Sequence, residues 1–221
     1  FEILFGINFS GRLNYVLTIL WILVLMNSIN FIDNMDGFAA INSSFICLAL
    51  TALSFVFNQN YLADVSFVLL FTILGFTIYN FPPARLYMGD SGSLFIGFIF
   101  GFISILFDWN PTGQSYLYSS IAPIFLFFTI PLLDFSTVFI HRIKNNISPT
   151  TGGTDHISHR LLNKGYSVNS VLLLFSLLNV FIFLLIALTI VFESMSVIIF
   201  LIYVIIILTL FIKFQKLEPL N

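Results

Sequence analysis

Residues 13–37 read LNYVLTILWILVLMNSINFIDNMDG, an apolar run that changes abruptly into a series of amides and carboxylates. The run from Leu13 to Met26 carries no charge and predicts a membrane-spanning helix, which needs about 20 mostly apolar residues. The polar residues that follow at steps of three are Asn27, Asn30, Asp33 and Asp36. Placing such groups at the end of a membrane helix costs free energy unless they bind something. This stretch therefore indicates a membrane enzyme rather than a plain membrane anchor.

The composition of the whole chain also indicates a membrane protein. Of its 221 residues, 59% are hydrophobic and 8% are charged, whereas about 25% of the residues in a typical soluble domain are charged. The single cysteine, Cys47, excludes a disulfide within the chain. We therefore predict an all-α polytopic membrane protein in which residues 1–221 form one integral membrane domain, without a soluble domain.

Seven segments are long and apolar enough to be transmembrane helices. They are residues 12–30, 38–57, 62–81, 91–107, 117–140, 169–192 and 195–213. Gly97 and Gly101 form a GxxxG pair in the short segment 91–107, which predicts a close approach of two helices. The chain begins at Phe1 without the layout of a signal peptide, so we expect it to be the C-terminal part of a longer protein.

The basic residues divide unevenly between the two sides that seven alternating spans define. One side carries the C-terminal tail and the loops at about 31–37, 82–90 and 141–168. It holds seven of the eight lysines and arginines, which are Arg85, Arg142, Lys144, Arg160, Lys164, Lys213 and Lys216. Because cytoplasmic loops carry an excess of such residues, this side is predicted to be the cytoplasmic face of the inner (plasma) membrane. Every polar motif falls on that side, which favours an active site there.

The polar series at residues 27–36 has the donor atoms of a binding site. A step of three residues is about 300° in an α-helix, so the four side chains share one face only if the helix end tightens to a 3₁₀ turn. Carboxylates and amides together suit a divalent cation, a sugar hydroxyl or a nucleobase edge. The alternative is that they only cap the helix end and interact with water at the membrane surface.

A second motif, YMGDSGS at residues 87–93, is expected to begin a helix. Free N–H groups at a helix start attract phosphate, and Asp90 can hold Mg²⁺ against it, because Mg²⁺ takes one or two carboxylates plus substrate phosphates. The alternative is that Asp90 only caps the helix.

The loop 141–168 contributes cations and imidazoles. Its residues of interest are Arg142, His156, His159 and Arg160. Two histidines are too few for a structural zinc site, so with an arginine beside them they suit an anionic phosphate better. The alternative is a solvated basic loop. Asp134 precedes this loop and is either an interfacial residue or a partner of the loop.

Four motifs together resemble the polyprenyl-phosphate N-acetylhexosamine-1-phosphate transferases. They are NSINFIDNMDG, MGDSGSLFIGF, IPLLDFSTVFIHRI and DHISHRLL, in the order in which that membrane family has them. The resemblance extends over essentially the whole chain. It is nearest to the undecaprenyl-phosphate N-acetylglucosamine-1-phosphate transferase branch.

The resemblance implies a reaction that initiates the synthesis of a cell-surface glycan. A HexNAc-1-phosphate, N-acetylglucosamine-1-phosphate in the nearest branch, passes from a UDP-N-acetylhexosamine to undecaprenyl phosphate, and UMP is released. Mg²⁺ is the implied cofactor, with Mn²⁺ as an alternative, and Asp90 looks like its ligand. Membrane lipid is an implied partner and nucleic acid is not, and a homodimer is left open.

The resemblance also implies roles for individual residues. Asp33, Asp36 and Asp90 look like the catalytic carboxylates. The residues that look like substrate-binding groups are Asn27, Asn30, Asp33, Arg142, His156, His159 and Arg160.

The chain departs from the family pattern in two places. Ser158 stands where the HIHH-like motif of the nearest branch has a histidine, which leaves the sugar open. The family's DDxxK-like acidic pair does not occur, and we expect it upstream of Phe1. Two other classes of protein stay open. One is a transporter or channel fragment, although its ion ligands would usually lie near the middle of the bilayer. The other is a catalytically inactive homologue.

Overall fold

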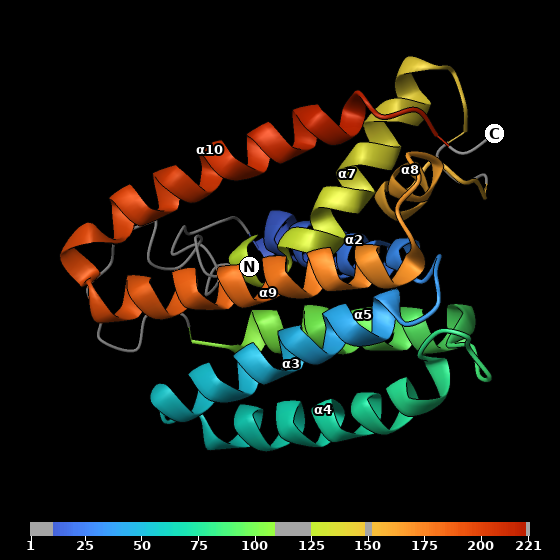
Figure 1. The fold of residues 1–221 in the computed structure, drawn as a ribbon. Helices are drawn as coiled ribbons and strands as arrows, with labels where there is room; N and C mark the ends of the chain where they lie inside the picture. The colour runs from blue at the N-terminus through green and yellow to red at the C-terminus, as the bar shows by residue number, and fades with distance from the viewer. Residues whose placement is uncertain (1–10, 109–124, 149–151, 220–221) are drawn as a thin grey trace.

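The computed structural model describes residues 11–108, 125–148 and 152–219, and the regular structure in these ranges is helical. The elements are α2 (Gly11–Ile32), α3 (Phe38–Val56), α4 (Asn60–Asn80), α5 (Gly89–Leu106), α7 (Thr129–Lys144), α8 (Ile157–Asn163), α9 (Val168–Val191), the 3₁₀ turn η1 (Glu193–Met195) and α10 (Ser196–Gln215). Six of these α-helices, all except α7 and α8, are long and apolar enough to cross a membrane. The prediction of an all-α polytopic membrane protein is confirmed (Figure 1).

The helix ends refine the predicted spans. The helix α5 begins two residues before the short segment 91–107 and ends one residue before the end of that segment, so at 18 residues it is the shortest of the six candidate spans in the described residues. The predicted span 117–140 lies partly outside the described residues, and its described part continues as α7 to Lys144. The expected loop 141–168 therefore begins with a helical turn and contains α8.

Two glycines allow α2 and α5 to pack very closely. A Cβ on Gly97 would lie 2.5 Å from Cα of Met26, and one on Gly101 would lie 3.2 Å from Cα of Ile22. Further along the same pair, Nε1 of Trp21 donates a hydrogen bond to Oγ of Ser104 at 2.9 Å. The close approach brings the C-terminal end of α2 against the N-terminal end of α5.

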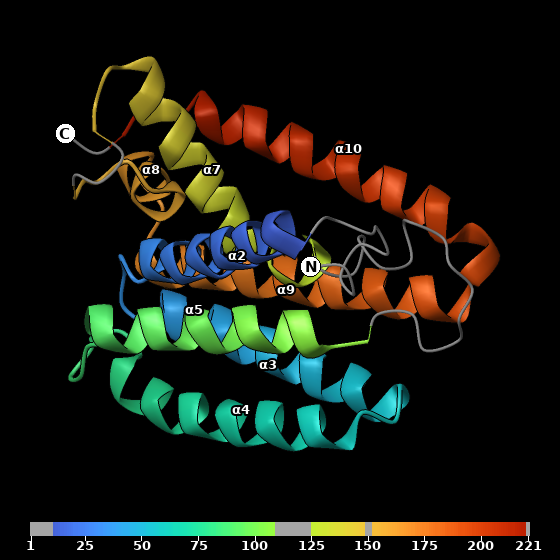
Figure 2. The same cartoon turned by 180° about the vertical axis from the view of Figure 1, so that it is seen from behind.

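The other helices extend the bundle on both sides of this pair. The helix α3 packs against α4 and α9, while α7 packs against α2 and α10 (Figures 1 and 2). The core between them is apolar, and its fully buried side chains include Leu25, Phe38, Phe100 and Phe175. Most of α10 is exposed and apolar, as expected for a helix surrounded by lipid.

One end of the bundle gathers the polar connections. There α2, α4, α7 and α10 end, α5 and α9 begin, and α8 lies beside them (right in Figure 1, left in Figure 2). The connections 33–37 and 81–88 and the described residues between α7 and α9 therefore meet at this end.

Candidate active site

Side chains from the end of α2 meet side chains from the start of α5. The Asn30 amide donates hydrogen bonds to Oδ1 of Asp90 and to Oγ of Ser93, both at 2.9 Å. Asp33, just beyond α2, accepts a hydrogen bond from the backbone N–H of Gly89. We call Asn30, Asp33, Asp90 and Ser93 the acidic cluster. It joins two motifs that lie 60 residues apart in the chain.

The turn after α2 is held against the connection between α4 and α5. Gly37 has a φ of +74°, a left-handed conformation that glycine adopts at little cost. Its N–H donates to Oδ1 of Asn80 at 3.0 Å, and the Asn80 amide donates to a carbonyl of the connection at 2.8 Å. Oδ2 of Asp36 accepts a hydrogen bond from the backbone N–H of Ala84 at 2.9 Å. These bonds hold the start of α5 beside the end of α2.

The electrostatics of the acidic cluster favour a cation. Burial raises the pKa of Asp33 to about 6, and the charge of Asp90 adds to this rise against the opposing effect of the Gly89 hydrogen bond. Within the described residues, neither carboxylate forms an ion pair with lysine or arginine, and no three histidine, cysteine or acidic side chains gather into a complete metal site. Two carboxylates fit Mg²⁺, which completes its shell with water and substrate phosphates.

A second group of charged residues lies between α7 and the start of α8. Nδ1 of His156 lies 2.8 Å from Oδ2 of Asp134, and the backbone N–H of Ile157 donates to Oδ1 of the same carboxylate at 2.7 Å. Asp134 is only 1% exposed, so both of its oxygens are used inside the protein. It is therefore a partner of the histidine-bearing loop and not an interfacial residue.

Arg142 and Asp155 form the other charged pair in this group. Nε and Nη2 of Arg142 donate to the two carboxylate oxygens at 2.9 and 2.7 Å. Burial raises the pKa of the Asp155 carboxyl, but the hydrogen bonds and charge of Arg142 outweigh burial and hold that pKa below its usual value. A Cβ on Gly153 would lie 2.7 Å from Oδ1 of Asp155, so glycine fits beside the pair where a larger residue would not. We call Asp134, Arg142, Asp155, His156 and His159 the histidine cluster.

Asn34 connects the turn after α2 with α8. Its Oδ1 accepts a short hydrogen bond from Oγ of Ser158, and its backbone forms a hydrogen bond with His159. Burial and the charge of His156 lower the pKa of His159. His159 therefore sits against the same loop that carries Asp33.

Phe31 forms a second link between the two clusters. Its ring lies edge-on to the His156 ring, with centroids 5.3 Å apart, and the guanidinium carbon of Arg142 lies 5.6 Å from its centroid. The last turn of α2 thus carries a polar residue toward α5 and an aromatic residue toward α7 and α8. The last turn of α2 and the turn after it therefore connect the acidic and histidine clusters at one end of the bundle, and we call the two clusters with these connecting residues the polar region.

Three residues predicted for the site bind other parts of the protein. The Asn27 amide donates to a carbonyl of its own helix at 2.7 Å. Asp36 holds the α4–α5 connection. Arg160 is 1% exposed, and its guanidinium donates to backbone carbonyls of the segment before α8 and of the tail after α10. Roles of these residues toward a substrate stay predictions.

Several residues that build the polar region were not singled out from the sequence. They are Phe31, Asn34, Asn80, Ser93 and Asp155. Asn80 carried a usable signal, because it is a lone amide at the end of an apolar helix. So did Asp155, because it is the one acidic residue in a basic loop and directly precedes His156.

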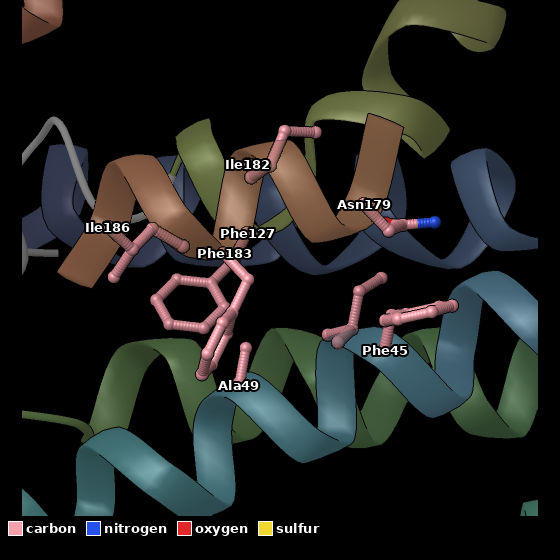
Figure 3. A pocket seen from close by; sticks show the side chains of 8 residues that line it. Phe45, Ala49, Phe127, Asn179, Ile182, Phe183 and Ile186 are labelled. Atoms are coloured by element: carbon pink, nitrogen blue, oxygen red, sulfur yellow. The ribbon is translucent and has the colours of Figure 1, made fainter. Parts of the chain in front are cut away.

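An apolar pocket between α3 and α9 is separate from this region (Figure 3). It is lined by Phe45, Ile46, Ala49, Phe127, Asn179, Ile182, Phe183 and Ile186. Its one polar residue, Asn179, is already bonded to Asn42 and to a carbonyl of α9. Without a titratable side chain, this pocket offers no acid–base or metal chemistry.

Carboxylates, imidazoles and a buried arginine gather at one end of a helical membrane bundle. The protein is therefore a polytopic membrane protein with a polar site at the ends of its helices. The first 108 residues match the model of the family described as "Glycosyl transferase family 4". Together with the relatives below, this match shows that the chain belongs to glycosyl transferase family 4.

The curated relatives agree with this family. Over 157 residues the chain is 34% identical to a probable undecaprenyl-phosphate N-acetylglucosaminyl 1-phosphate transferase of Bacillus subtilis, covering 71% of this chain and 43% of the relative. It is 30% identical over 174 residues to a decaprenyl-phosphate N-acetylglucosaminephosphotransferase of Mycolicibacterium smegmatis, covering 72% and 43%. A phospho-N-acetylmuramoyl-pentapeptide-transferase of Moorella thermoacetica is 37% identical over 91 residues, covering 41% of this chain and 29% of the relative. The chain thus spans less than half the length of these relatives.

Proposed function

We propose that this chain forms part of a membrane transferase that moves N-acetylglucosamine-1-phosphate from UDP-N-acetylglucosamine to undecaprenyl phosphate and releases UMP. The observation that carries the proposal is the meeting of the acidic and histidine clusters at one end of a membrane bundle. In the reaction, an oxygen of the lipid phosphate attacks the β-phosphorus of the donor, and the bond from that phosphorus to the bridging oxygen of UMP breaks. The product is a polyprenyl diphosphate sugar.

The acidic cluster supplies the metal side of the proposed site. Asp90 and Asp33 would hold Mg²⁺, which would neutralise charge on the donor diphosphate. Asn30 orients the Asp90 carboxylate through its hydrogen bond. Because phosphoryl transfer depends mainly on positioning and charge stabilisation, such fixed geometry is what the chemistry requires.

The histidine cluster supplies the phosphate side of the proposed site. Nδ1 of His156 is bonded to Asp134, so Nε2 is the atom that a ligand would meet. His159 lies one helical turn away, with its ring centroid 6.1 Å from that of His156. Arg142 keeps a fixed position through Asp155 and adds positive charge near the same place.

The position of the polar region suits a lipid acceptor. A polyprenyl phosphate has its phosphate at the membrane surface and its chain among the lipid tails. A site at the ends of apolar helices meets such a phosphate without moving it through the bilayer. An ion pathway would instead need its ligands near the middle of the helices, whereas the charged residues described here, apart from Asp134 within α7, lie at helix ends or in the connections.

The test is transfer by the complete protein in proteoliposomes that contain undecaprenyl phosphate. We expect Mg²⁺-dependent release of UMP from UDP-N-acetylglucosamine, with labelled sugar phosphate recovered in the lipid extract. UDP-N-acetylgalactosamine and a UDP-N-acetylmuramoyl-pentapeptide serve as competing donors. Asp64→Asn, at the opposite end of α4 from the polar region, is the control and should keep full activity. Release of UMP without labelled lipid, or no release from any donor, would refute the proposal.

A further inference from the structure

We infer that Asp134 is a positioning residue, which fixes the orientation of His156 and keeps Nδ1 protonated, so that the imidazolium presents Nε2–H as a donor to an anionic oxygen of the donor diphosphate. The inference rests on the proposed function for the identity of the ligand. The arrangement of Asp134 and His156 rests on the structure alone.

The hydrogen bonds of Asp134 limit the state of the imidazole. Its carboxylate accepts the backbone N–H of Ile157 on Oδ1 and contacts Nδ1 of His156 on Oδ2, at 2.7 and 2.8 Å. A carboxylate only accepts hydrogen bonds, so Nδ1 of His156 must carry a proton. In the neutral imidazole this leaves Nε2 as an acceptor, and in the imidazolium it leaves Nε2–H as a donor.

The remaining neighbours of His156 hold its ring in place without engaging Nε2. The Phe31 ring packs edge-on against the imidazole. The side chain of His156 makes no hydrogen bond other than that to Asp134 within the described part of the chain. The ionisable groups around it are His159 on α8 and the Arg142–Asp155 pair. Asp155 is already engaged by Arg142 through two hydrogen bonds, which leaves Asp134 as the carboxylate that binds His156.

This arrangement predicts a specific consequence of replacing Asp134 by asparagine. In Asp134→Asn, the side-chain oxygen can still accept from Ile157, while an N–H₂ group replaces the oxygen that faced Nδ1. Nδ1 must then accept a hydrogen bond, and the neutral ring changes to the Nε2–H tautomer. The shape and the contact with Ile157 are kept, so the substitution isolates the effect on the imidazole.

The first experiment measures the tautomer directly. The chain is labelled with ¹⁵N-histidine, and its side-chain resonances are recorded at about pH 9, well above the usual histidine pKa of about 6.5. His156→Gln assigns the signal. In the wild type, Nε2 of His156 should show the downfield shift of a nitrogen without a proton, and in Asp134→Asn the shift should move to Nδ1. An unchanged tautomer would overturn the inference, whatever the substrate of the protein.

The second experiment asks whether Asp134 acts through His156. In the complete protein, asparagine cannot pair with an imidazolium as the carboxylate does. We therefore expect Asp134→Asn to weaken binding of UDP-N-acetylglucosamine by about 10- to 100-fold, by analogy with carboxylates that orient metal-binding histidines. In a His156→Gln background the same substitution should change binding less than twofold or so, because the two residues act as a unit. Equal losses in both backgrounds would show a purely structural role and overturn the inference. Asp64→Asn is again the matched control.

The two experiments separate failure of the inference from failure of the proposed function. A wild type that neither binds nor uses any UDP-sugar would refute the proposed function, while the NMR result would still decide the role of Asp134. A wild type that binds the donor while Asp134→Asn behaves normally would refute the inference alone.

Discussion

The acidic cluster and the histidine cluster differ in how their charges are balanced. In the acidic cluster, Asp33 and Asp90 repel each other, and burial raises the pKa of Asp33 to about 6. In the histidine cluster, Asp155 binds Arg142 and Asp134 binds His156 and a backbone N–H. The difference teaches that the carboxylates of the histidine cluster are balanced by groups of the protein itself, whereas we propose that a bound cation balances those of the acidic cluster. Substitutions should therefore have opposite effects on stability in the two clusters.

The largest expected effect is in the histidine cluster. Arg142→Met leaves Asp155 buried without its partner, and breaking such a pair on one side costs about 3–5 kcal/mol. The measurement is the free energy of unfolding in detergent. Lys144→Met, on an exposed position of the same helix, is the control and should change little. If Arg142→Met is no more damaging than Lys144→Met, the histidine cluster is not the self-contained scaffold described above.

Next in size is the loss of transfer activity in the acidic cluster. Asp90→Asn keeps the shape of the side chain and removes one of the two charges that would hold Mg²⁺. The expected loss is about 10²- to 10³-fold in rate, by analogy with the removal of one group that stabilises charge in a transition state. UMP release by the complete protein is the readout. Retention of more than about a tenth of the activity would contradict the metal-binding role and leave Asp90 only its favourable position in the first turn of α5, because its side chain does not cap that helix.

A third effect separates the clusters by their response to metal. Mg²⁺ at about 100 times its dissociation constant should raise the free energy of unfolding by about 2.7 kcal/mol, because it binds only the folded state. We expect Asp90→Asn to abolish this gain and His156→Gln to keep it. Thermal unfolding with Mg²⁺ and with a chelator measures both. Equal gains in the two variants would place the cation outside the acidic cluster.

The smallest expected effect is a stabilisation. Because the pKa of Asp33 is raised to about 6 in the folded chain, ionising it opposes folding as the pH rises through the interval from about 4 to about 6. Asp33→Asn should therefore stabilise the metal-free protein at pH 7 by about 1–2 kcal/mol, after allowance for solvent screening. The gain should vanish near pH 4, where the wild-type carboxyl is protonated. A stabilisation that does not depend on pH would contradict this account.

The sequence was sufficient to predict the fold class and the end of the bundle that carries the polar groups. Membrane helices alternate in direction, so the charges of Arg85 and Arg142 could be assigned to one side from the helix count alone. The same argument placed Asp33 and Asp90 together, because one follows a helix and the other begins a later helix at the same end.

Pairings within the polar region could not be predicted in the same way. Asn30 meets Asp90 because Gly97 lets α2 approach α5 closely, and the resulting register depends on three-dimensional packing. Residues spaced by three do not share one face of an α-helix, so Asn27 points away from this contact. The helical turn up to Lys144 was not predicted, because basic residues are common both in loops and in the last turn of a helix.

The contact between Asn30 and Ser93 has a consequence for the order in which the protein matures. The two residues are 63 positions apart, and Asn34 and Ser158 are 124 apart. At a synthesis rate of about 5–20 residues per second, roughly 3–13 s separate the appearance of α2 from that of its partner α5. The last turn of α2 must wait in the translocation machinery or in the bilayer for both later segments. A nascent chain stalled after α5 would contain the acidic cluster without the histidine cluster.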